Sequence, residues 1–466
     1  MGIISSMILS RYYDMANYGT YKQVMYVYNT LLIVFTLGLP RAYSYFLPRV
    51  PNNQAFQLIK KITSIFFVLG TVFSITLFVF SGVIANILKN DELEVALRIF
   101  AIVPTLLLPT MGLEGILATY KQSSKMALYT VVTRAIMLLS VIVPVCFFHG
   151  GYIEAICGFV FSSVISLLIA SYLKYSPIKD EGKDKCTISL RDIFKFSVPL
   201  LTASIWGMII ESSDQFFVSR YFGNEVFADF SNGNMNMPFI GMITGATTTV
   251  LSPVFSRMNY DKVDPHTEIF PLWKSVFEKS AMLIYPMVLY CLVFADVIMV
   301  FLYGKQYEVS GVFFQIKLLT NFFTIIAFAP LLINIGKVKF FSSVHFYGAI
   351  SLVVLEFIAV SLFKTPYSIS VTSAVCSIGR VLVMLLAISK FFEVRFKELF
   401  PTRLLFSIIL PSLIILVFIR WSLFKFCSFN VIYTIGFSLL LYVVLFAFYC
   451  YLAKIDYLKI LKSLKK

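Results

Sequence analysis

Long apolar segments, separated by short polar ones, run through the whole chain. A helix that crosses a bilayer needs about 20 mostly apolar residues, and these segments lack the alternation of polar and apolar positions found in outer-membrane strands. They predict about 14 transmembrane helices, the first of them incomplete. The expected helices lie near residues 1–10, 22–40, 59–88, 96–118, 126–148, 151–174, 196–218, 226–256, 276–302, 312–335, 340–363, 366–389, 402–420 and 429–453. The pattern therefore predicts an all-α polytopic membrane protein.

Lysine and arginine are distributed unevenly between the two sides of this membrane protein. Of the 39 Lys and Arg, 27 fall in the loops after the even-numbered helices and in the tail 454–466. Basic connections face the cytoplasm, so these loops and the C-terminus are predicted to be cytoplasmic. Arg134 and Arg380 lie well inside expected helices and belong to none of the loops.

Composition excludes an ordinary soluble enzyme. Apolar residues make up 59% of the chain and charged residues only 14%, against about 25% charged residues in average proteins. The net charge of +15 is explained by topology and does not indicate a nucleic-acid partner. The 7 cysteines and 3 histidines show no spacing typical of a metal site or a disulfide framework, so we expect neither, and no catalytic residues.

A charged linker at 176–195 divides the chain into two halves that resemble each other. Ser10-Arg11-Tyr12 recurs as Ser219-Arg220-Tyr221, and at the same shift Tyr18-Gly19-Thr20-Tyr21 aligns with Phe227-Ala228-Asp229-Phe230. Six helices per repeat is an even number, so both repeats would enter the membrane in the same direction, around a central cavity. We expect an N-lobe at 1–175, a C-lobe at 196–390, two extra helices at 400–453 and a basic tail at 454–466.

Several short motifs resemble those of bacterial polysaccharide flippases of the O-antigen (Wzx) type, which belong to the multidrug/oligosaccharidyl-lipid/polysaccharide exporter superfamily. The resemblance rests on Leu9-Ser10-Arg11-Tyr12, Tyr18-Gly19-Thr20-Tyr21, Gly38-Leu39-Pro40, Tyr45-Phe46-Leu47-Pro48, Asp214-Gln215, Ser219-Arg220-Tyr221-Phe222-Gly223, Phe301-Leu302-Tyr303-Gly304-Lys305-Gln306-Tyr307, Asn334-Ile335-Gly336-Lys337 and Lys339. The matches extend over nearly the whole chain. They are short and degenerate, so they indicate the superfamily better than the substrate.

The resemblance implies a function. Such a protein would move an undecaprenyl-diphosphate-linked oligosaccharide across the bacterial inner membrane by alternating access, for surface polysaccharide such as the O-antigen of lipopolysaccharide. It would need no cofactor, and its transport could be coupled to H⁺ or Na⁺. Its partners would be membrane lipids and the polysaccharide polymerase machinery. A cation-coupled multidrug extruder and a lipid II flippase remain alternatives. A membrane polymerase or glycosyltransferase is disfavoured because no large loop is present.

The first helix departs from the second repeat. About 21 residues precede Ser219 within its helix, but only 9 precede Ser10. We therefore expect that the first helix is about 12 residues short.

Four arginines are candidates for contact with the diphosphate, because guanidinium offers paired donors and keeps its charge. By motif position the resemblance assigns this role to Arg11, and the repeat extends it to Arg220; the alternative for both is an anchor at the membrane interface. Arg134 and Arg380 would lie deep in the membrane, where charges face a cavity or a partner. For Arg134 the alternative is an ion pair, for instance with Glu114 or Glu154.

Uncharged polar residues in two expected helices are candidates for contact with sugar. Tyr26 and Asn29 lie near one face of the second helix, and Asn232 and Asn236 lie in the eighth. Helix packing is the competing explanation. The acids Asp214 and Glu114 are candidates for ion coupling, since a desolvated carboxylate can bind and release a proton; the alternative for both is a salt bridge or an interfacial cap.

Overall fold

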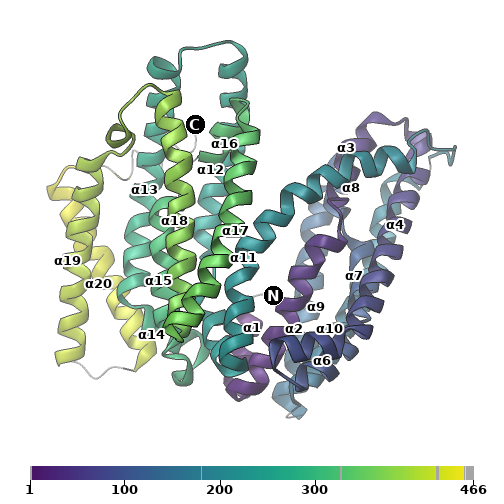
Figure 1. The fold of residues 1–466 in the computed structure, drawn as a ribbon, viewed down its shortest axis with the longest axis horizontal. Helices are drawn as coiled ribbons and strands as arrows, with labels where there is room; N and C mark the ends of the chain where they lie inside the picture. Colours follow the sequence, from purple (N-terminus) through teal and green to yellow (C-terminus); the bar gives the residue numbers. More distant parts are fainter. Residues whose placement is uncertain are drawn as a thin grey trace. The chain divides into compact units, whose positions relative to one another are not determined.

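The computed structural model describes residues 3–148, 150–179, 181–325, 328–426, 430–455 and 457. These residues form helices and connections, without a strand among them (Figure 1). Among these described residues, twelve helices are long and apolar enough to cross a membrane, and a bent pair brings the number to 13. The expectation of an all-α polytopic protein is confirmed. One of the seven cysteines, Cys427, and one of the three histidines, His149, lie outside the described residues, as does most of the basic tail.

The chain folds as two compact units, 1–228 and 229–466. The helices of unit 1 are α1 (Ile3–Tyr12), α2 (Met15–Phe35), α3 (Pro40–Phe46), α4 (Asn52–Val79), α5 (Ser81–Leu88), α6 (Glu92–Phe100), α7 (Val103–Leu107), α8 (Leu113–Thr119), α9 (Ser123–Phe148) and α10 (Tyr152–Tyr175). Helix α11 (Leu190–Gly233) begins in unit 1 and ends in unit 2. The short helix α1 is not among the candidate membrane spans.

Unit 2 contains the remaining helices. They are α12 (Pro238–Tyr260), α13 (Phe270–Val293), α14 (Ala295–Tyr303), α15 (Ser310–Thr324), α16 (Phe328–Asn334), α17 (Val338–Phe363), α18 (Pro366–Phe391), α19 (Thr402–Phe426) and α20 (Val431–Leu452). The bent pair is α15 with α16. The lobe boundaries expected from the sequence stay a prediction. The division between the two compact units lies after Ala228, within α11, and thus later in the chain than the expected linker at 176–195.

The expected linker is held against unit 1. The amide of Asn53, at the start of α4, donates to Asp184 at 2.7 Å, and the ammonium of Lys61 donates to the backbone oxygen of Ile188 at 2.6 Å. Helix α11 begins at Leu190, so the end of the expected linker is helical.

Three expected helix boundaries were wrong, each for a local reason. The expected helix at 226–256 is interrupted between Gly233 and Pro238, where proline occupies the first turn of α12 and disfavours helical backbone in the residue before it.

The expected loop after Ser219 is helical apart from Gly223, whose φ is 85°. Helix α2 starts at Met15, because the carboxylate of Asp14 accepts a hydrogen bond from the backbone N–H of Asn17.

Helices α9 and α10 pack closely because of a glycine. Pro144 has no N–H, so the carbonyl of Ser140 one turn earlier lacks its usual helical partner. A side chain at Gly158 of α10 would clash with that carbonyl. Glycine therefore allows the two backbones to approach here, as small residues do between membrane helices.

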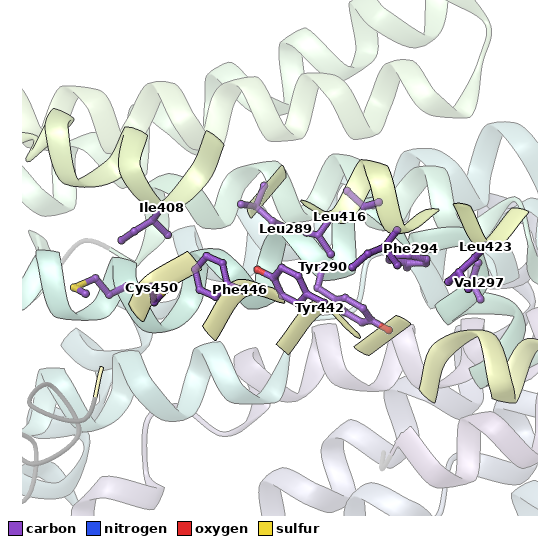
Figure 2. Close-up of a cluster of buried hydrophobic side chains, with 13 residues drawn as sticks. Leu289, Tyr290, Phe294, Val297, Ile408, Leu416, Leu423, Tyr442, Phe446 and Cys450 are labelled. Atoms are coloured by element: carbon purple, nitrogen blue, oxygen red, sulfur yellow. The ribbon is translucent and has the colours of Figure 1, made fainter. Parts of the chain in front are cut away.

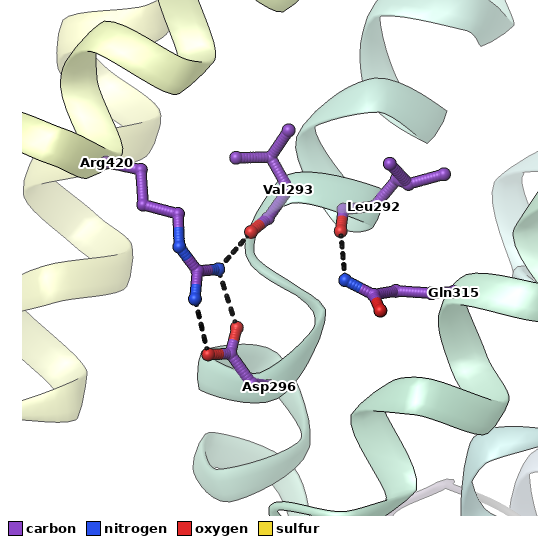
Figure 3. Close-up of polar contacts among 5 residues, drawn as sticks. All are labelled: Leu292, Val293, Asp296, Gln315 and Arg420. Carbon is purple, nitrogen blue, oxygen red and sulfur yellow. Dashed lines mark hydrogen bonds and ion pairs between the residues drawn. The ribbon is translucent and has the colours of Figure 1, made fainter.

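Helices α19 and α20 are docked on α13 through an apolar core and polar contacts. Figure 2 shows the core, in which the rings of Tyr290 and Tyr442 stack with centroids 5.9 Å apart. The guanidinium of Arg420 donates to both carboxylate oxygens of Asp296, at 2.8 and 2.7 Å, and to the backbone oxygen of Val293 (Figure 3). The two extra helices are thus anchored in unit 2.

Candidate functional site

Arg134 lies near the middle of the 26-residue α9, and its side chain is exposed. Within the described part of the chain, neither Glu114 nor Glu154 forms an ion pair with it. A charge at this depth would contact either lipid or a water-filled space, and contact with lipid is costly. Arg134 is therefore the strongest of the four arginine candidates.

Arg380 lies near the middle of α18 and is half-buried. Its side chain crosses Gly348 of α17, where a Cβ atom would clash with it, and its guanidinium donates to Ser377 at 3.0 Å. Glycine at position 348 thus gives the arginine room to lie along α17.

Arg220 has a structural contact. Its guanidinium donates to the backbone oxygens of Asn86, at 3.2 Å, and Ile87. These carbonyls belong to the last turn of α5, where four backbone oxygens lack helical partners and a cation is favoured. The other motif arginine, Arg11, is exposed in the last turn of α1.

The polar residues of α2 serve different purposes along the helix. Gln23 is buried and donates to Ser219 at 2.8 Å, while Asn90 donates to Gln23 at 2.6 Å and to Thr20 at 2.9 Å. This network joins α2 to α11 and to the turn between α5 and α6, so its amides hold helices together.

Tyr26 and Asn29 lie further along α2. Tyr26 is half-buried and donates to the backbone oxygen of Ser212 at 3.3 Å, whereas Asn29 is exposed. The two asparagines expected in one helix are also separated: Asn232 is buried in the last turn of α11, and Asn236 is exposed in the connection to α12. Tyr26 and Asn29 belong to unit 1, and Asn232 and Asn236 belong to unit 2.

The two acids proposed for ion coupling lie in different surroundings. Asp214 is buried within α11, and Glu114 is exposed on α8.

Sequence reasoning missed a third acid, Asp229. This carboxylate is only 8% exposed, and its Oδ1 accepts a hydrogen bond from the hydroxyl of Ser310 at 2.7 Å. It forms no ion pair within the described residues. The repeat contained a signal, because Asp229 aligns with Thr20, whose hydroxyl also accepts a hydrogen bond, from Asn90 just before α6.

Lys174 was also missed. Its side chain is 1% exposed, and its ammonium donates to the backbone oxygen of Met111 at 2.9 Å and to the hydroxyl of Tyr43 at 3.2 Å. Lys174 ends the expected helix at 151–174, next to a loop predicted to be cytoplasmic, where a lysine side chain normally extends toward water. Here it is directed into the unit instead.

Comparisons with known proteins agree with this fold. The model of a family described as polysaccharide biosynthesis protein matches residues 8–311. A protein of Shigella flexneri named "Putative O-antigen transporter" is 21% identical over 326 residues, which cover 67% of this chain and 76% of that protein.

Two solved structures share the fold. A lipid II flippase, MurJ, in an inward closed conformation matches with a TM-score of 0.69 and 16% identity, over 96% of this chain and 95% of that one. An inward-facing multidrug resistance transporter of the MATE family, within the MOP superfamily, matches with a TM-score of 0.66 and 12% identity, over 84% and 94%. Since the family model covers more than half of the residues, the chain belongs to the family of polysaccharide biosynthesis proteins.

Proposed function

We propose that this protein is a flippase that moves an undecaprenyl-diphosphate-linked oligosaccharide across the bacterial inner membrane. Family membership supports a role in polysaccharide synthesis, and the name of the Shigella relative supports transport of O-antigen. The fold shared with a lipid II flippase supports a lipid-linked cargo and alternating access. In this proposal the C-terminus is cytoplasmic, the protein catalyses no covalent chemistry, and the polymerase machinery receives the product.

One observation at the site carries the proposal furthest, namely the exposed Arg134 in the middle of α9. A guanidinium in a water-filled part of the membrane would attract the diphosphate, with two donors for two oxygens. Arg11, Arg220 and Arg380 are proposed as further phosphate contacts, Arg220 with less support because it already contacts α5.

The remaining candidates are assigned by chemistry. Tyr26, Asn29, Asn232 and Asn236 offer hydroxyl and amide groups to the glycan. Asp214, Glu114 and Asp229 are proposed for coupling to H⁺ or Na⁺, and burial with a single serine partner favours Asp229 among them.

Two other functions follow from the same fold. Lipid II itself as cargo is supported by the TM-score of 0.69 to MurJ. A multidrug extruder is supported by the MATE likeness, but arginine in the middle of α9 disfavours a cationic drug.

Complementation tests the proposal. The chain is expressed in a bacterial strain that lacks its O-antigen flippase, and surface polysaccharide is scored. We expect surface polysaccharide to be restored. Absence of surface polysaccharide together with a gain of drug resistance would overturn the proposal.

A further inference from the structure

Unit 2 contains a large apolar groove between α13 and α20. Its volume is about 960 Å³, within the range of sites that bind small molecules. Met287, Tyr290, Val443 and Ala447 are among the side chains that line it. The lining is almost wholly apolar, which suits a hydrocarbon chain.

A second, polar pocket adjoins the groove. It has a volume of about 590 Å³, and Ile455 lines both cavities, which makes them neighbours. Lys454 lines the groove at this junction. An apolar groove therefore opens beside a polar pocket, which is the arrangement that an amphipathic lipid requires.

The polar pocket carries charges of both signs. Lys274 and Glu278 come from the first half of α13, and Arg403 comes from the start of α19. Arg403 and Lys454 are exposed, and Glu278 is half-buried. None of these four residues forms an ion pair within the described part of the chain.

This charge pattern distinguishes between lipid head groups. Lysine and arginine donate charge-assisted hydrogen bonds to a phosphate. A carboxylate in the same pocket repels an added anion but accepts hydrogen bonds from an ammonium group. A head group with one phosphate and one amine satisfies both signs, whereas a polyprenyl diphosphate carries no amine for Glu278.

We propose that the groove and the adjoining pocket bind one membrane phospholipid of the phosphatidylethanolamine class. An acyl chain lies in the groove, the phosphate contacts Lys454 and Arg403, and the amine contacts Glu278. The site lies between α13 and the two extra helices α19 and α20, and it is independent of the proposed flippase activity. The bound lipid would hold α19 and α20 against α13, in addition to the apolar core and the polar contacts described above.

The test is native mass spectrometry of the purified full-length protein after incubation with phosphatidylethanolamine, phosphatidylglycerol or undecaprenyl phosphate. We expect one phosphatidylethanolamine to be retained at least several-fold better than either other lipid. Ala447→Trp, which fills the groove, should lower retention of all lipids. Arg403→Gln and Lys454→Gln should lower retention of both phospholipids.

Glu278→Gln is the decisive variant, because it changes one charge and little volume. It should remove the preference for phosphatidylethanolamine over phosphatidylglycerol, while Glu393→Gln and Lys397→Gln, on an exposed connection outside the pocket, should leave retention unchanged. Equal retention of the two phospholipids by the wild type would overturn the proposal. So would a preference that survives Glu278→Gln, or stronger retention of undecaprenyl phosphate, which would assign the groove to an isoprenoid chain.

Discussion

The hydroxyl of Tyr457 donates a hydrogen bond of 2.9 Å to the backbone oxygen of Met282, the carbonyl that Pro286 leaves without its helical partner. The same arrangement occurs in α19, where Pro411 frees the carbonyl of Ser407 and Tyr449 donates to it at 2.7 Å. Inside a bilayer no water satisfies such a carbonyl. Tyrosine hydroxyls thus tie the end of the chain to the kinked helices of unit 2.

Removing either hydroxyl should destabilise unit 2. Tyr457→Phe and Tyr449→Phe each leave one buried carbonyl without a donor, at a cost of about 1 to 3 kcal/mol. Thermal unfolding in detergent should show a lower midpoint for both. Tyr433→Phe, at an exposed position of α20, is the matched control. Unchanged midpoints for the first two variants would show that these hydrogen bonds do not stabilise the fold.

The pair between Asp296 and Arg420 should contribute a measurable coupling energy. Both side chains are only about one third exposed, at 30% and 35%, and interactions between polar groups in membrane helices are worth about 1 kcal/mol. A double-mutant cycle with Asp296→Asn and Arg420→Gln measures this coupling by equilibrium unfolding. Additive effects of the two substitutions would contradict a direct interaction.

The arginines should divide into functional and structural groups. Arg134→Ala should lower transport about 10- to 100-fold, the loss expected for a charge-assisted contact, without changing the amount of protein in the membrane. Arg380→Ala should behave in the same way.

Arg220→Ala should instead lower the amount of folded protein, because it exposes the carbonyls at the end of α5. Membrane fractions quantified by immunoblot alongside surface polysaccharide separate the two effects. A large loss of protein in Arg134→Ala would assign a structural role to that arginine as well.

Asp229 offers a test of ion coupling. Asp229→Asn keeps an oxygen to accept the hydrogen bond from Ser310 but cannot change its charge. We expect folding to be retained and the dependence of transport on a proton or Na⁺ gradient to be lost, measured in proteoliposomes with imposed gradients. Ser310→Ala is the companion variant, and it should retain the gradient dependence. A gradient response in Asp229→Asn equal to that of the wild type would exclude this carboxylate.

Hydropathy was enough to predict the class of the fold and most of its spans, since a bilayer imposes the length and composition of each helix. It could not predict breaks inside apolar segments. The helix expected at 59–88 ends at Val79 and resumes at Ser81, and the one expected at 276–302 is interrupted at Phe294. At both positions a phenylalanine leaves the helical backbone conformation.

The candidate site was less predictable, because the type of a residue does not determine whether its side chain points into the protein or toward its surface. Gln23, on the same helix as Tyr26 and Asn29, is fully buried in a network that joins helices, whereas Asn29 is exposed. Lys174 extends into the protein although its position favoured the membrane surface. Asp229 could have been found by following the repeat from Thr20, since both side chains accept a hydrogen bond near the start of a later helix: Thr20 from Asn90 just before α6, and Asp229 from Ser310, the first residue of α15.

Reconstitution measures the proposed transport of a lipid-linked oligosaccharide directly. Purified protein is placed in liposomes loaded with undecaprenyl-diphosphate oligosaccharide, and the fraction of glycan that a lectin can reach from outside is followed over time. We expect this fraction to rise beyond its starting value with the wild-type protein and to rise about 10- to 100-fold more slowly with Arg134→Ala. A constant fraction with the wild type, or an equal rise with Arg134→Ala, would contradict this expectation.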